Sequence, residues 1–142
     1  MEKVSERFKF GKLNIYVGLV TLLLAGFGGM GLGLTFDQYA VKGGEHVLAL
    51  TRFYLREGHS HGMPIAIYNL VVGLLVDRWL LLAKACRACS ISAALGIVLP
   101  LGLAAKGAAG APADFPPFGM IGVLGLIVSA VVLLVAKKRT AT

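Results

Sequence analysis

Four long apolar runs constrain this chain more than any other feature of its sequence. The first and last of them contain no charged residue, and together the runs cover residues 13–34, 62–82, 89–105 and 118–136. A helix needs about 20 residues to cross the hydrocarbon core of a bilayer. Because lipid cannot satisfy the hydrogen bonds of an exposed backbone, each run is predicted to be a transmembrane helix. The sequence thus predicts one all-α integral membrane domain over residues 1–142, a four-transmembrane-helix bundle.

Composition excludes the other broad classes of protein. Hydrophobic residues make up 57% of the 142 residues, and charged residues only 15%, against about 25% in a typical soluble domain. A soluble fold of this length could not bury so much apolar surface, and a disordered chain would carry far less of it. The lipid bilayer is therefore the first predicted partner of the chain.

The basic residues predict the orientation of the four spans. With four crossings, ten of the fourteen Lys and Arg and three of the seven Asp and Glu fall on the side of the termini. That side carries the whole net charge of +7, while the four bases and four acids of the other side balance. By the positive-inside rule, both termini are expected to be cytoplasmic, in a bacterial inner membrane. The excess charge is an orientation signal, so nucleic acid is not expected as a partner.

The first outer loop contains a segment suited to an interfacial helix. Residues 45–57 lack Gly and Pro and place charged side chains on one helical face and apolar ones on the other. Gly44 before the segment and Gly58 after it are expected to end it. An amphipathic helix lying in the membrane interface is predicted here.

The same loop holds the candidate metal ligands. Glu57, His59 and His61 stand together at the start of the second run, and imidazole and carboxylate groups suit zinc or copper. Further donors on that side are His46, Met63 and Asp114. His59 and His61 converge only if the backbone between Gly58 and Gly62 is irregular, since each helical step turns about 100°. The alternative is that these histidines make hydrogen bonds at the level of the lipid head groups and hold no metal ion or heme.

Two polar residues are expected deep in the second span. Tyr68 and Asn69 lie within an otherwise apolar run, and polar side chains at that depth face protein or a cavity. They are predicted either to make hydrogen bonds between helices or to form the polar wall of a quinone or solute pocket. Few ionisable residues lie along the spans, which disfavours a proton-driven transporter.

Cys86 and Cys89 form a C-x-x-C motif on the predicted cytoplasmic side. Two cysteines cannot complete a tetrahedral zinc site. They are a candidate redox pair beside the basic residues Lys84 and Arg87, or else two small residues at the start of a helix. Nearby, Asp77 and Arg78 are expected to pair with each other or with lipid phosphate.

Small residues recur at helical spacing in two spans. In the first span they are Ala25, Gly29 and Gly33, and in the fourth span Gly119, Gly122 and Gly125. Such stripes let helix backbones approach closely, either within one chain or between chains.

These features lead to three hypotheses of function. The first is a structural or accessory membrane protein that associates with itself or with a larger membrane complex, and no catalytic constellation argues for an enzyme. The second is a metal-, heme- or quinone-binding subunit of a respiratory or copper-handling assembly that uses Glu57, His59 and His61. The third is a small-solute transporter or channel that uses Tyr68 and Asn69.

Overall fold

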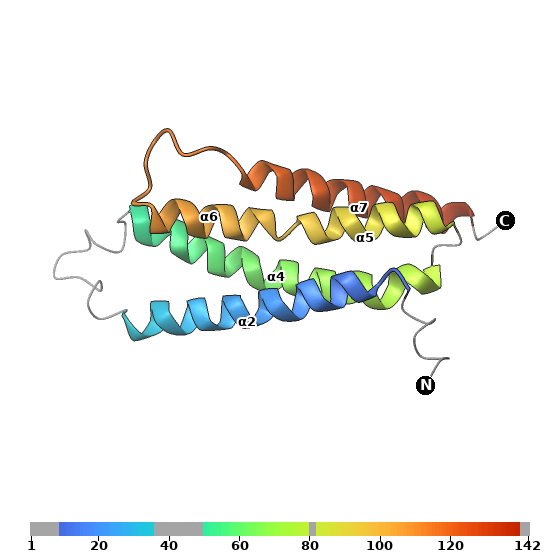
Figure 1. Cartoon of the computed structure of the whole chain (residues 1–142), viewed down its shortest axis with the longest axis horizontal. Helices are drawn as coiled ribbons and strands as arrows, with labels where there is room; N and C mark the ends of the chain where they lie inside the picture. Colours follow the sequence, from blue (N-terminus) through green and yellow to red (C-terminus); the bar gives the residue numbers. More distant parts are fainter. Residues whose placement is uncertain (1–8, 36–49, 80–81, 140–142) are drawn as a thin grey trace.

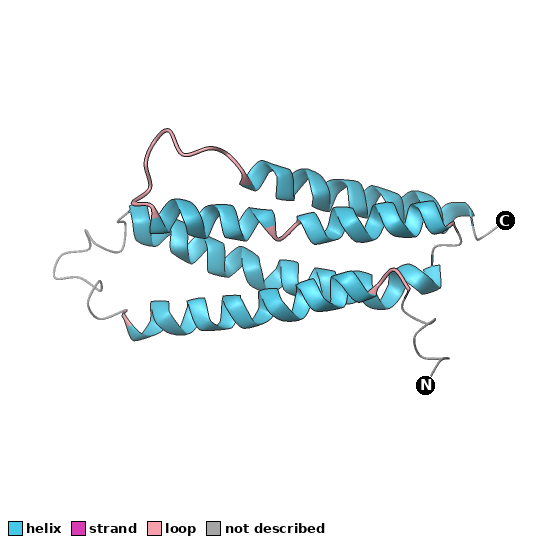
Figure 2. Cartoon of the chain, viewed as in Figure 1, coloured by secondary structure: helices cyan, strands magenta, loops and turns pink. Residues whose placement is uncertain are grey.

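The computed structural model describes residues 9–35, 50–79 and 82–139. In this part of the chain all regular structure is helical (Figures 1 and 2). The helices run side by side along the long axis of the molecule. In chain order they are α2 (Lys12–Leu34), α4 (Leu50–Trp79), α5 (Ala83–Leu95), α6 (Val98–Ala108) and α7 (Gly119–Arg139).

Three helical segments are long and apolar enough to cross a membrane. They are Lys12–Leu34, Leu50–Trp79 and Ala83–Ala108, the last combining α5 and α6, and a shorter apolar helix covers Gly119–Val135. Their outward surfaces carry large apolar side chains, such as Leu34, which is 79% exposed, and Leu134, which is 68% exposed. Such a surface is stable in hydrocarbon but not in water. The prediction of an all-helical protein with helices apolar enough to span a membrane is confirmed, and one of these helices covers the first predicted run, 13–34.

The predicted break at Gly58 is wrong. Residues 45–49 of the expected interfacial helix lie outside the described part, and from Leu50 one helix runs through Gly58 to Trp79. A Cβ at Gly58 would lie 2.9 Å from the carbonyl oxygen of Pro100, and one at Gly62 would lie 3.1 Å from the Ala25 side chain. These glycines thus let α4 approach its neighbours closely, so they serve packing and not termination.

The predicted bounds of the later spans also need correction. The described part of the second helix reaches Trp79, residues 80–81 lie outside the described part, and Leu82 already precedes α5. The turn expected at residues 83–88 is the first part of α5, so the third span is longer than the predicted 89–105. Lys84 and Arg87 are exposed on this helical surface, where basic side chains need no turn to reach water or head groups. The last helix covers Gly119–Arg139, against the predicted 118–136.

The core is built from small side chains. α4 packs against α2 on one side and against α6 and α5 on the other, and α7 packs against α5 and α6. The buried cluster comprises Val72, Val76, Cys86, Cys89 and Ala93. A Cβ at Gly122 would meet the backbone nitrogen of Leu99 at 2.5 Å. The glycine stripe of α7 is therefore used within the chain, against α5 and α6.

Candidate functional site

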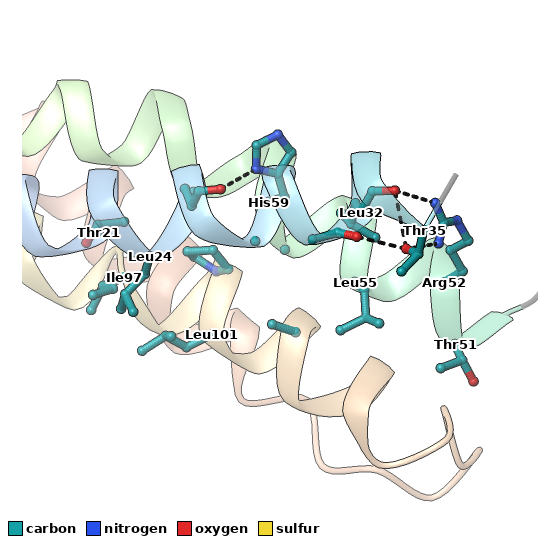
Figure 3. A pocket seen from close by; sticks show the side chains of 17 residues that line it. Thr21, Leu24, Leu32, Thr35, Thr51, Arg52, Leu55, His59, Ile97 and Leu101 are labelled. Carbon is teal, nitrogen blue, oxygen red and sulfur yellow. Dashed lines mark hydrogen bonds between the residues drawn. The ribbon is translucent and has the colours of Figure 1, made fainter. Parts of the chain in front are cut away.

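A groove lies between α2, α4 and α6. α4 forms its floor, and α2 and α6 form its walls, because both pack on α4 but hardly touch each other over their described lengths. The hollow has a volume of about 380 Å³, which is within the ~300–1,000 Å³ typical of small-molecule sites. Figure 3 shows the side chains that surround it, among them Leu24 of α2, Leu55 of α4 and Leu101 of α6.

Pro100 explains why the third span leaves α2 and opens this groove. Proline has no backbone N–H, and its ring conflicts with the carbonyl four residues earlier in a helix. That carbonyl belongs to Gly96, and it accepts a hydrogen bond from the Leu99 N–H at 3.2 Å instead. Two further hydrogen bonds of the same short spacing precede it, from the Gly96 N–H to the Ala93 carbonyl and from the Ile97 N–H to the Ala94 carbonyl. The helix is therefore interrupted between α5 and α6. α5 stays in contact with α2, whereas α6 does not.

The two ends of the groove differ in chemistry. Its deeper part is lined by apolar side chains such as Leu24, Ile97 and Leu101, while Thr35, Thr51 and Arg52 lie at the other end. Arg52 donates from Nη1 to the Thr35 hydroxyl at 3.1 Å and from Nη2 to the Leu32 carbonyl at 2.7 Å. This guanidinium thus holds the first described turn of α4 to the C-terminal end of α2, where a cation is also favoured by the helix dipole. The groove is amphipathic along its length.

His59 is half-buried between α4 and α2. Its Nδ1 lies 2.7 Å from the Ala25 carbonyl oxygen. Because a carbonyl only accepts, Nδ1 donates its proton in this hydrogen bond. The imidazole occupies the space that a side chain at Gly29 would need. His59 also lines the groove, and in Figure 3 its ring extends on the side of α2 away from Ile97 and Leu101.

The structure does not bring His59 and His61 together. Both lie on the continuous helix α4, so their side chains leave it about 200° apart. His61 faces Glu57 instead, with Nδ1 2.9 Å from the Glu57 carbonyl and 3.7 Å from its carboxylate, which also pairs with Arg56 at 3.5 Å. Over residues 9–35, 50–79 and 82–139 no group of three or more His, Cys, Asp or Glu could hold a metal ion. His46, the fourth candidate ligand, lies outside these ranges.

Asn69 lies at the centre of a polar network that joins three helices. It accepts from Asn14 Nδ2 of α2 at 2.9 Å and donates to the Ala93 carbonyl of α5 at 3.1 Å. Asn14 also donates to the Ser90 carbonyl at 2.9 Å. The single proton of the Ser90 hydroxyl is shared between Asn14 Oδ1 and the Phe10 carbonyl, the latter at 2.8 Å. Asn14, Asn69 and Ser90 are all buried. This arrangement matches the interhelical alternative for Asn69, and the residue does not line the groove.

Tyr68 makes a second polar link, from α4 to α7. Its hydroxyl lies 2.7 Å from the Ser129 hydroxyl, which in turn donates to the Leu126 carbonyl at 2.9 Å. Sequence reasoning missed Asn14, Ser90 and Ser129 as the partners of Asn69 and Tyr68. All three are polar residues within apolar runs, and this pattern could have identified them, because polar side chains at membrane depth form hydrogen bonds with one another between helices.

Asp77 does not act as expected. Its carboxylate accepts from the backbone N–H groups of Phe10 and Gly11, at distances from 2.9 to 3.2 Å. These groups precede the first turn of α2, whose own N-terminal residue offers no side-chain cap. Asp77 therefore caps α2 from a helix more than sixty residues away in sequence.

The two cysteines are free and buried. Cys86 Sγ lies 3.6 Å from the Val76 carbonyl, and Cys89 Sγ lies 3.8 Å from the Ser129 carbonyl. Both thiols thus point into the interface between α4, α5 and α7. This location fits the alternative of small core residues at the start of a helix.

The fold and the groove define a class: an all-helical bundle with membrane-spanning character and a side groove of amphipathic lining. Comparison with known proteins adds no narrower assignment. No protein-family model, no curated protein and no solved structure matches this chain.

Proposed function

We propose that this chain is an accessory protein that crosses the bacterial inner membrane four times and associates with itself or with a larger membrane complex. The three spanning candidates support this view. α7 adds a fourth helix of 21 residues, about 32 Å long at 1.5 Å per residue, of which the part Gly119–Val135 is apolar. An even number of crossings leaves both termini on one side, and the basic residues on that side make it the cytoplasmic one.

The observation that carries the association is an empty glycine face on α2. Gly26 and Gly33 are seven residues apart, so they lie on the same face of the helix. A Cβ at either position would meet nothing within 4 Å. Small residues on a surface that faces lipid let another helix approach closely, which favours packing in a membrane. This face is therefore the one through which we expect a partner helix to pack.

The test is the oligomeric state of the full-length chain in mild detergent, measured by native mass spectrometry and cross-linking. We expect the wild-type chain to form an oligomer or a complex of fixed stoichiometry, and Gly26→Leu to dissociate it. Gly28→Leu is the matched control, because Gly28 also has open space around its Cβ position but faces about 200° away on the same helix. A monomeric wild-type chain, or equal effects of the two variants, would contradict the proposal.

A second candidate function is favoured by the groove. A half-open apolar hollow with a guanidinium and two hydroxyls at one end suits an amphipathic molecule. A quinone-binding subunit of a respiratory assembly has this requirement. Organic extraction of the purified chain, with an absorbance scan of the extract and metal analysis of the protein, tests this function. A groove-dependent amphiphile in the extract supports it, and an empty extract argues against it.

A further inference from the structure

The groove opens sideways, toward the surroundings of the bundle and not into its interior. Its walls include Leu24, which is 54% exposed, and Leu101, which is 48% exposed. α2 and α6 hardly touch each other, so the groove between them is not closed. In a membrane, hydrocarbon chains of the bilayer therefore reach the groove directly. Its apolar lining is not a site where water is stable, since water needs two to four polar partners.

With α2 across a bilayer, the length of this helix puts the polar end of the groove close to the lipid phosphates. α2 has 23 residues, so it is about 34 Å long and spans about the thickness of the hydrocarbon core. Arg52 is bound to its last turn and to Thr35 just beyond it. This guanidinium therefore sits where the helix leaves the core. Arginine is well suited to phosphate because its planar donors match the phosphate oxygens.

A second cation lies at the same end of the bundle. Lys106 Nζ is 4.6 Å from the centre of the Tyr54 ring, and a Cβ at the adjacent Gly107 would be 2.8 Å from the Thr51 carbonyl. The end of α6 is thus packed beside the mouth of the groove, which Thr51 lines. The nearby Glu57 carboxylate already pairs with Arg56. Among the described residues at this end, the cations Arg52 and Lys106 are complementary to an anion.

We propose that the groove holds one hydrocarbon chain of an anionic phospholipid, with the lipid phosphate at Arg52. This proposal rests on the second candidate function, amphiphile binding, and specifies its ligand. The apolar walls take the chain, the guanidinium takes the phosphate, and the side opening lets the rest of the lipid stay in the bilayer.

Two pairs of variants isolate the two parts of the site. Gly28 lines the groove, and a Cβ there would meet nothing within 4 Å. Gly28→Leu is therefore expected to fill part of the groove, while Ala130→Leu adds a leucine at an exposed position of α7 that does not line the groove. For the head group, Arg52→Gln removes the charge at the mouth, and Arg56→Gln removes a neighbouring charge that does not line the groove.

The experiment titrates the full-length chain in mild detergent with phosphatidylglycerol and with phosphatidylcholine, and counts bound lipid per chain by native mass spectrometry. We expect one phosphatidylglycerol per wild-type chain, bound about tenfold more weakly by Gly28→Leu and by Arg52→Gln. Ala130→Leu and Arg56→Gln should stay within about twofold of the wild type. The preference for phosphatidylglycerol should disappear in Arg52→Gln. Arg52→Lys keeps the charge and should keep that preference, which covers the case in which Arg52→Gln does not fold.

Other results would overturn the proposal in distinguishable ways. Equal effects of Gly28→Leu and Ala130→Leu would show that the lipid does not bind in the groove. Equal effects of Arg52→Gln and Arg56→Gln would show that the phosphate does not bind at Arg52. A benzoquinone probe whose binding depends on Gly28 but not on Arg52 would replace the phospholipid and leave the second candidate function intact. If neither lipid nor quinone binding responds to Gly28→Leu, both the inference and that candidate function fail.

Discussion

Replacing Asn69 with leucine removes the central side chain of the interface between α2, α4 and α5. The Asn69 side chain is fully buried and makes two hydrogen bonds to other helices, one with Asn14 and one with the Ala93 carbonyl. Interhelical hydrogen bonds in membranes contribute about 0.6 kcal/mol on average and at most about 1.7 kcal/mol each. Asn69→Leu should therefore lower the free energy of unfolding by about 1 to 3 kcal/mol.

The assay is unfolding of the chain by titration of SDS into a mild detergent. Unfolding is monitored by the fluorescence of Trp79, the only tryptophan of the chain. Ser60→Ala is the control, because the exposed Ser60 hydroxyl bonds within its own helix, to the Glu57 carbonyl. It should leave the free energy of unfolding within about 0.5 kcal/mol of the wild type.

A double-mutant cycle with Asn14→Leu tests whether the bond between the two asparagines carries the effect. Once Asn14 is leucine, Asn69→Leu should cost about 0.6 to 1.7 kcal/mol less than it does alone, because the shared bond is already gone. Strict additivity of the two substitutions, or a stable Asn69→Leu protein, would refute the assignment of this network as a helix clamp.

Three further predictions concern packing, capping and orientation. Gly73→Ala should lower the free energy of unfolding by about 1 to 3 kcal/mol, because its Cβ would lie 2.9 Å from the Gly11 carbonyl oxygen. Gly31→Ala, whose Cβ would meet nothing within 4 Å, should be neutral or stabilising in the same SDS titration. Asp77→Ala should cost about 0.5 to 2 kcal/mol by removing the cap of α2, and Asp77→Asn, which keeps one acceptor oxygen, should cost less. Reporter fusions at either terminus should indicate the cytoplasm and an insertion within residues 107–117 the outside; one terminus found outside would exclude four crossings.

The sequence predicted the spans better than their ends. The first span was predicted to within one residue, because an uncharged apolar run has one stable solution in lipid. Gly58 misled the prediction because glycine weakens an isolated helix, yet in the bundle it admits the Pro100 carbonyl. At Gly58 the weak helix propensity of glycine favours a break, whereas the close contact with α6 favours a continuous helix, and the helix is continuous.

The candidate site was harder to predict than the spans. His59, His61 and Glu57 are adjacent in sequence, but a continuous helix turns the two histidines to different sides. The groove is built from residues of three helices that no local pattern connects. Its cause, Pro100, is visible in the sequence, but a proline alone does not reveal which neighbouring helix the chain will leave.

Hydropathy by itself determined that this chain is helical and belongs in a membrane, because the cost of an unpaired backbone in lipid depends only on local composition. Only the tertiary structure decided which polar residues meet: Asn14 with Asn69 and Ser90, and Asp77 with the start of α2. It also decided which glycines face a helix and which face open space. These outcomes depend on the rotation and separation of whole helices, which are set by the sum of many contacts between segments distant in sequence.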